Sequence, residues 1–80
     1  MPVIDLLTPD QRRALRRLAD VPRGIAETLM VAYGFRRDSM NVLVLAGLAT
    51  VVTETVRIGA ETINVDLIMI TDAGRKAIEE

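Results

Sequence analysis

The chain contains no cysteine and no histidine, and only two of its 80 residues, Tyr33 and Phe35, are aromatic. Without cysteine there can be no disulfide and no thiolate metal site, and without histidine the chain lacks the commonest metal ligand and general base. Half of the residues are nevertheless hydrophobic. We therefore expect an aliphatic core with both aromatic side chains inside it, and neither a metal nor a cofactor.

Strong net charge and long apolar segments are also missing. Ten basic residues stand against eleven acidic ones, which excludes a polybasic arm or an acidic tail. The longest apolar run, residues 42–49, has eight residues, whereas a membrane span needs about 20. Residues 1–7 contain Asp5 and have no basic start, unlike a signal peptide. We expect a soluble, cytoplasmic protein that does not bind membranes.

Catalytic motifs are absent as well. Ser39 lies near a helix start, but no histidine or cysteine is available to activate it. Asp66 and Asp72 have no second carboxylate at a spacing that predicts acid–base or metal chemistry. The glycines occur singly, so there is no phosphate-binding loop. The sequence predicts that the protein is not an enzyme.

The first predicted helix follows Thr8, a favourable N-cap. Pro9 suits the first helical position, and Gln11 stands where a capping box needs Glu or Gln. The helix should run to about Asp20, because the residue before Pro22 is disfavoured in helical conformation. One face is apolar, and the other carries four arginines: Arg12, Arg13, Arg16 and Arg17.

Two further helices are predicted before residue 48. The first covers residues 25–33 and ends at Gly34, and the second is capped by Asp38 or Ser39 and ends at Gly47. Glycine is the preferred residue directly after a helix. The expected inward positions are Ile25, Leu29 and Ala32 in the first of these helices, and Met40, Leu43 and Val44 in the second.

From Ala49 the apolar period changes from that of a helix to that of a strand. Two β-branched segments flank Gly59-Ala60, which predicts an antiparallel hairpin with a type II′ turn. Pairing Ile58 with Glu61 makes one face of the ribbon apolar throughout, since it places Val56 opposite Ile63 and Val52 opposite Leu67. This agreement favours a two-residue loop, and a longer loop is the alternative.

A short helix should close the chain after Thr71, which is a good N-cap, with Asp72 at the positive end of the helix dipole. No linker, repeat or low-complexity segment divides residues 1–80. The sequence predicts one α+β domain with a three-helix core, a two-stranded antiparallel hairpin and a short C-terminal helix.

Three segments resemble a known fold family. Ile25-Ala26 with Leu29 and Gly34-Phe35 resembles the first helix and turn of a helix-turn-helix motif. Met40 and Leu43 followed by Gly47-Leu48-Ala49 resemble its second helix and the "L-x-x-x-G-L-V" stretch that leads into a wing. Residues 70–75, Ile-Thr-Asp-Ala-Gly-Arg, resemble the "L-T-x-x-G-R" segment after the wing. Residues 8–78 thus resemble a winged helix-turn-helix domain of MarR-type and related bacterial DNA-binding regulators.

The resemblance implies a site for duplex DNA. In that family the second helix of the motif enters the major groove and the wing tip contacts backbone or minor groove. Here this would be the helix near residues 37–47 and the wing near residues 57–62. Arginine suits guanine, asparagine suits adenine, and serine reaches phosphate. The expected DNA-binding residues are Arg36, Arg37, Ser39, Asn41 and Arg57. A transcriptional regulator or an accessory to one, acting as a homodimer, is the implied function.

Other residues favour an alternative. The helices also carry apolar side chains on their predicted outer faces, and exposed apolar patches mark partner surfaces. These residues are Met30, Val31, Val42 and Leu45. Basic and acidic residues also cancel between positions 21 and 61, although a DNA-binding face needs local positive potential. The alternative function is therefore a winged-helix protein-interaction or homodimerisation module that does not bind DNA.

Overall fold

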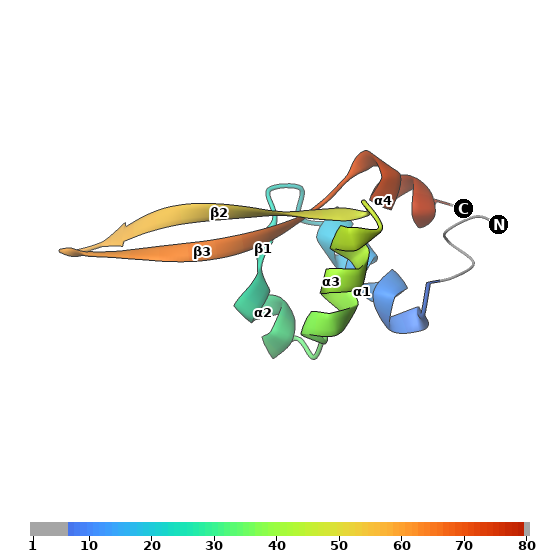
Figure 1. The fold of residues 1–80 in the computed structure, drawn as a ribbon, viewed down its shortest axis with the longest axis horizontal. Helices are drawn as coiled ribbons and strands as arrows, with labels where there is room; N and C mark the ends of the chain where they lie inside the picture. Colours follow the sequence, from blue (N-terminus) through green and yellow to red (C-terminus); the bar gives the residue numbers. More distant parts are fainter. Residues whose placement is uncertain (1–6, 80) are drawn as a thin grey trace.

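The computed structural model describes residues 7–79, which form helices around one end of a long β-hairpin (Figure 1). The elements follow in the order α1 (Pro9–Ala19), β1 (Ile25–Ala26), α2 (Glu27–Ala32), α3 (Arg37–Leu45), β2 (Ala49–Ile58), β3 (Glu61–Ile70) and α4 (Asp72–Ala77). The strands form one antiparallel sheet in the order β1-β3-β2. The predicted small α+β fold is confirmed at this level.

The capping box of α1 forms as predicted. The Gln11 N–H donates to Thr8 Oγ1 at 3.1 Å, and the Thr8 N–H donates to Gln11 Oε1 at 3.0 Å. These bonds satisfy two backbone donors that a helix start otherwise leaves without a partner. Ala14, Leu15 and Leu18 are fully buried, so the apolar face of α1 packs into the core as its spacing predicts.

The prediction of a helix over residues 25–33 was wrong at its start. Ile25 and Ala26 are extended and pair with Ile68 and Leu67 of β3, so that helix α2 begins only at Glu27. Burial of the β-branched Ile25 against the sheet outweighs the helical spacing of the segment. Two residues are too few to show a strand period, which is why the sequence did not indicate β1.

This shorter helix turns a different face inward from the predicted one. Met30 is fully buried, whereas Leu29 is 44% exposed and Ala32 is also exposed.

In α3 the predicted inner residues Met40 and Leu43 are buried. The predicted cap of α3 was wrong, because Arg36 is the N-cap and no side chain caps the helix. As expected, α2 is followed by Gly34 and α3 by Gly47, and both glycines have a positive φ.

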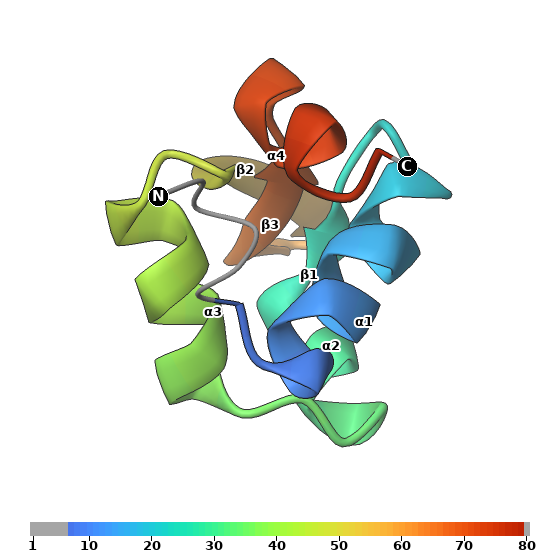
Figure 2. The same ribbon diagram turned by 90° about the vertical axis from the view of Figure 1, so that its right-hand side faces the viewer.

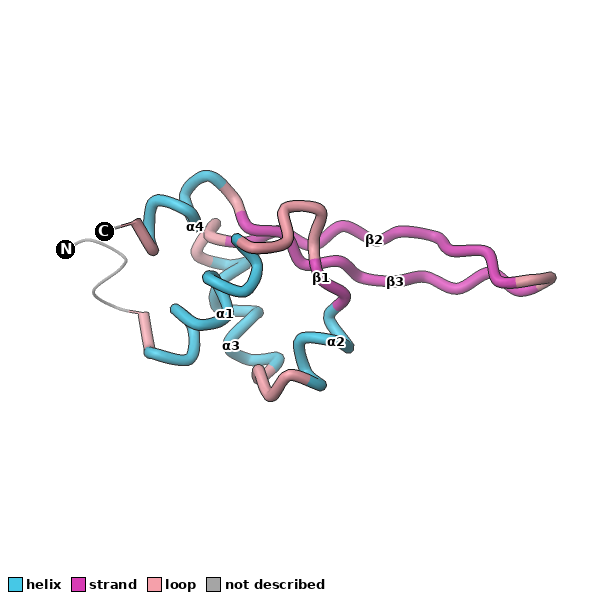
Figure 3. The backbone as a smooth tube through the Cα atoms, turned by 180° about the vertical axis from the view of Figure 1, so that it is seen from behind, coloured by secondary structure: helices cyan, strands magenta, loops and turns pink. Residues whose placement is uncertain are grey.

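The hairpin has the predicted register. Ile58 pairs with Glu61, Val56 with Ile63 and Val52 with Leu67. Gly59 has φ +62° and Ala60 does not have a positive φ, which is the pattern of a type II′ turn. The hairpin extends beyond the helices in Figures 1 and 3, along the 50 Å long axis of the molecule.

The core lies where the helices cover the base of the hairpin. Its buried apolar residues are Ala14, Leu15, Leu18, Ile25, Met30, Met40, Leu43, Leu48, Ala49 and Ile68. Phe35 packs against this cluster. Tyr33 does not, so its predicted place in the core was wrong: it is 48% exposed and lies under the guanidinium of Arg17, 4.5 Å from the ring centroid. A phenol keeps its hydroxyl hydrated there and still attracts a cation.

Thr71 and Gly74 join α4 to the end of α3. Thr71 Oγ1 donates to the carbonyl of Gly47 at 2.6 Å and accepts from the Gly74 N–H at 3.0 Å. A Cβ on Gly74 would collide with the carbonyl oxygen of Leu48 and lie 2.7 Å from Ile70 Cγ1. The T-x-x-G spacing therefore has a structural reason here, since glycine alone permits this close approach.

Candidate nucleic-acid interface and apolar surfaces

The outward face of α3 changes character along its length. Arg37, Asn41 and Leu45 are spaced four residues apart and are all exposed, as expected for one stripe of a helix. Arg36 precedes the helix as its N-cap and is exposed, while Ser39 is half-buried. The N-terminal half of the stripe is thus polar and basic, and Leu45 makes its C-terminal end apolar. Four of the five predicted DNA-binding residues lie at this helix.

Nearby charges reduce the positive potential of this region. Arg37 forms an ion pair with Glu27 of α2, with Nη1 and Oε1 3.3 Å apart. Asp38 follows in the first turn of α3. Arg36, in contrast, has no ion-pair partner among residues 7–79 that the structure records. Of the two arginines at this end of α3, Arg36 is therefore the more available to an external anion, because Arg37 shares its charge with Glu27.

The first turn of α3 lacks a capping side chain. In the part of the chain that the structure describes, no side chain caps this turn, because the N-cap residue is Arg36. The N–H groups of a helix's first turn have no carbonyl partner within the helix, and the helix dipole adds partial positive charge there. Backbone donors and the Arg36 guanidinium thus meet at one exposed end of α3, an arrangement that suits a phosphate oxygen.

The fifth predicted residue, Arg57, is not close to the other four. It lies near the turn of the hairpin, opposite Thr62, about eight residues along β2 from the buried Ala49. At roughly 3.3 Å per residue this distance is about 26 Å. Figure 1 shows the hairpin turn at one end of the molecule and α3 near its middle. Arg57 and the α3 residues could therefore contact only a ligand that spans both regions.

The two faces of the outer hairpin differ in polarity. On the face that carries the buried Ile68, Thr53 Oγ1 donates to Asp66 Oδ1 at 2.8 Å and Thr55 Oγ1 donates to Asn64 Oδ1 at 3.1 Å. The opposite face carries Glu54 and Glu61 among apolar side chains. The exposed apolar residues on this opposite face are Val52, Val56, Ile58 and Ile63. The register was predicted correctly, but the face is not apolar throughout, because Glu54 and Glu61 lie on it. Nothing in the sequence indicated that this face would be uncovered.

The predicted apolar patch on α2 and α3 forms only in part. Met30 is in the core and cannot belong to an exposed patch. Val31, Val42 and Leu45 are exposed, and Leu45 is 87% exposed.

The arginines of α1 lie away from the exposed face of α3. Figure 2 shows α1 and α3 on opposite sides of the molecule, and Arg13 pairs with Asp10 at 2.8 Å.

In comparisons with known proteins, no family model, no curated protein and no solved structure matches the chain. Within residues 7–79, no three acidic side chains gather at a point where a metal ion could be held. The helices described for these residues are all too short or too polar to cross a membrane.

Proposed function

We propose that the chain is a winged helix-turn-helix domain that binds duplex DNA and acts as a transcriptional regulator or an accessory to one. The order of elements supports this proposal: α2, a turn and α3 precede a long hairpin, and α1 packs behind them. In this proposal α3 enters the major groove and the hairpin is the wing. The pairing of β1 with β3 anchors the wing to the helix-turn-helix unit.

The observation that carries the proposal is the N-terminal end of α3. Arg36 and Arg37 are exposed there beside backbone N–H groups that no side chain caps. Asn41 lies one turn further on the same stripe as Arg37. The backbone donors and Arg36 would bind phosphate, Arg37 and Asn41 would read base edges, Ser39 would contact the backbone, and Arg57 would anchor the wing.

Two copies would act together in this proposal. The DNA-facing side of one copy offers few cations, and Arg37 shares its charge with Glu27. Specific protein–DNA complexes bury about 1,000–2,500 Å² of protein surface, which is large for one module of this size. A two-fold dimer doubles the contacts and places two recognition helices about 34 Å apart along the DNA.

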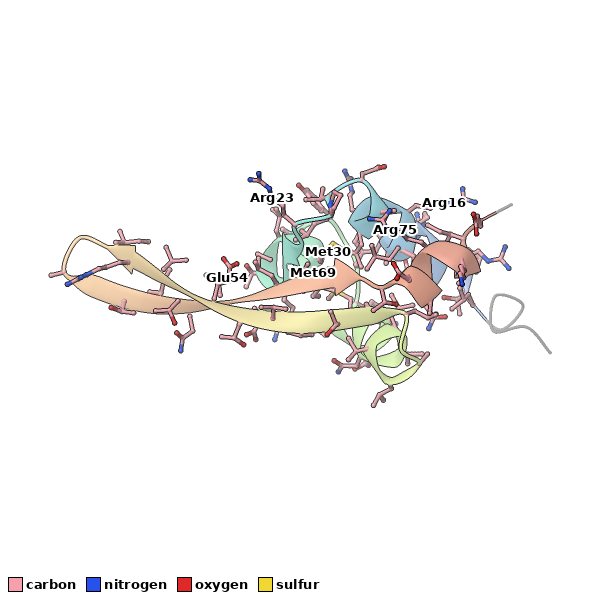
Figure 4. All side chains as sticks on the ribbon, turned by 90° about the horizontal axis from the view of Figure 1, so that it is seen from above. Arg16, Arg23, Met30, Glu54, Met69 and Arg75 are labelled. Atoms are coloured by element: carbon pink, nitrogen blue, oxygen red, sulfur yellow. The ribbon has the colours of Figure 1, made fainter. Side chains whose placement is uncertain are left out.

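The test is the salt dependence of DNA affinity. We expect the R36A/R37A variant to bind a fluorescein-labelled duplex more weakly than wild type, and to lower the slope of log K against log salt by about one for each bound copy, because Arg36 loses its phosphate contact. The matched control is R23A/R75A, which removes the same charge from exposed positions away from α3 in Figure 4. Equal affinity for the α3 variant and wild type would contradict the assignment of α3.

A second function is supported by a separate observation, the exposure of Leu45 and Val42 on α3. Large apolar side chains at such exposure are typical of surfaces that bind protein. In this alternative the domain uses α3 for a protein partner or a second copy and does not bind DNA. Replacing Val42 and Leu45 by Gln should then abolish self-association in sedimentation experiments, whereas DNA affinity should change little if the first proposal holds. A wild-type protein that sediments as a monomer would remove the homodimer form of this alternative.

A further inference from the structure

Strand β2 is an unprotected edge of the sheet. It pairs with β3 on one side, and among residues 7–79 no strand pairs with its other side. Proteins commonly protect such an edge with proline, lysine, a β-bulge or a very short strand. Residues 49–58 contain neither proline nor lysine, and all ten pair with β3 without a bulge. Figure 4 shows the helices gathered at the base of the hairpin, so the outer part of this edge is open to another strand.

Alternate residues of β2 direct their backbone groups toward the open edge. Ile58 and Glu61 flank the turn, and the C=O of the first residue of a β-turn accepts from the N–H of the fourth. The backbone groups of Ile58 therefore point toward β3, and those of Arg57, Thr55 and Thr53 point outward. Two copies of β2 related by a two-fold axis can pair through these outward groups, because such an axis makes the strands antiparallel and brings odd-numbered residues opposite each other.

Two observations restrict the register of this pair. A register centred on Thr53 would bring Arg57 of one copy against Ala49 of the other, which is buried where α3 packs on β2. A register centred on Glu54 would place the two Glu54 carboxylates directly opposite each other, which is destabilising. A register centred on Thr55 avoids both, and it places Glu54 opposite an apolar residue.

Charge complementarity selects the register centred on Thr55. It places Arg57 of one copy opposite Thr53 of the other, and Thr53 lies beside Asp66 in its own copy. Thr53 Oγ1 donates to Asp66 Oδ1 at 2.8 Å, and a carboxylate has further lone pairs that can accept from arginine. Arg57 can therefore reach across the short Thr53 side chain to Asp66 of the second copy. A register centred one residue further along places Arg57 opposite Thr55 and loses this contact.

We propose that two copies of this chain pair through β2, antiparallel and centred on Thr55, so that their hairpins form one continuous sheet. The outward backbone groups of residues 53–57 supply the hydrogen bonds. Val52 packs beside Ile58 of the second copy, and Arg57 contacts Asp66 of the second copy; by symmetry each contact is made twice. The guanidinium has five donors, so this contact leaves others for a phosphate.

The pairing also sets the spacing of the two α3 helices. Ala49 at the base of the hairpin is six residues from Thr55, so the two bases lie about 40 Å apart at roughly 3.3 Å per residue. The two-fold axis keeps both α3 helices on the same side of the pair. DNA half-sites one turn apart are spaced about 34–36 Å, which is similar. This consequence rests on the proposed function, whereas the pairing itself does not depend on DNA.

The pairing is tested by sedimentation velocity of the full chain without DNA, up to about 1 mM protein, where even weak pairing is detected. We expect a dimer, and V42Q/L45Q should dimerise like wild type because α3 lies outside this interface. A wild-type monomer at this concentration would overturn the proposal. Dissociation of V42Q/L45Q would also overturn it, by assigning the interface to α3.

Single cysteines read the register, since the chain has none of its own. In Thr55→Cys the two Cα atoms would lie about 5.5 Å apart, a separation that suits a disulfide. In Thr53→Cys they would lie four residues apart, about 13 Å. Each substitution removes one exposed hydroxyl on the same face. On mild oxidation Thr55→Cys should form disulfide dimers at least about tenfold faster, because 13 Å is too far for the bond. Equal rates, or faster dimer formation by Thr53→Cys, would overturn the register.

The charge contact is tested by reversal. Arg57→Asp and Asp66→Arg should each raise the dimer Kd roughly two- to thirtyfold, the range for two exposed ion pairs, and the double variant R57D/D66R should restore it. A double variant as weak as the sum of its single changes would overturn this contact. A dimer that does not bind DNA would remove the proposed function and leave the pairing, whereas DNA binding by a chain that stays monomeric would do the reverse.

Discussion

The two ends of the molecule are built on different principles. At the helical end, α1, α2 and α3 enclose a cluster of fully buried aliphatic side chains. Along the outer hairpin, every residue of β2 after Ala49 is exposed, and so are residues 61–64 of β3. The helical end therefore supplies the stability of the fold, whereas the outer hairpin is held mainly by its own strand pairing and turn. A segment that contributes so little to the core is available for binding.

The largest expected contrast is between matched truncations at the two ends. Leu15→Ala removes a fully buried side chain and should lower the free energy of unfolding by about 2–5 kcal/mol. Val56→Ala on the outer hairpin should lower it by less than about 1 kcal/mol. Urea denaturation followed by circular dichroism measures both. Similar losses for the two variants would contradict the division into a core end and a binding end.

The junction between α3 and α4 offers the next largest effect. Gly74→Ala forces a methyl group against the Leu48 carbonyl and Ile70, and should cost about 1–3 kcal/mol, as expected of overpacking. Ala73→Ser changes the exposed neighbouring position and serves as the control, with a loss below about 0.5 kcal/mol. A Gly74→Ala protein as stable as wild type would mean that α4 does not need this close approach.

Two threonines allow the same comparison for hydroxyl groups. Thr71→Ala removes both the helix cap and the bond to Gly47, and should cost about 1–2 kcal/mol. Thr53→Ala removes one exposed hydrogen bond to Asp66 and should cost less than about 0.5 kcal/mol. The measurement is the thermal unfolding midpoint of each variant beside wild type. A larger loss for Thr53→Ala would reverse the assignment of stability to the helical end.

The smallest expected effect is at the surface of the helical end. The Arg17 guanidinium over the Tyr33 ring should contribute about 0.5–1 kcal/mol, the usual value for an exposed cation–π pair. A double-mutant cycle with Arg17→Gln and Tyr33→Leu isolates this coupling. If the two substitutions are additive in urea denaturation, the contact is not stabilising.

Much of the fold, including the helical end and the long hairpin, was predictable from the sequence. Local signals gave the Thr8–Gln11 capping box, the Gly59 turn and the hairpin register, because each depends on neighbouring residues alone. Ile25, Met30 and Tyr33 were misplaced, because their positions depend on the pairing of β1 with β3, a contact between residues more than 40 positions apart. For the candidate site, the sequence indicated Arg36, Arg37 and Asn41, but not the Arg37–Glu27 pair, which tertiary packing creates.

We propose that the N-terminal end of α3 and the hairpin turn bind DNA. This proposal is tested most directly by recording amide ¹H–¹⁵N spectra of the full chain while a mixed-sequence duplex is added, at low salt and again near physiological salt. We expect salt-sensitive shifts concentrated in residues 36–41 and 57–62. An absence of shifts at low salt, or shifts confined to the arginines of α1, would contradict it.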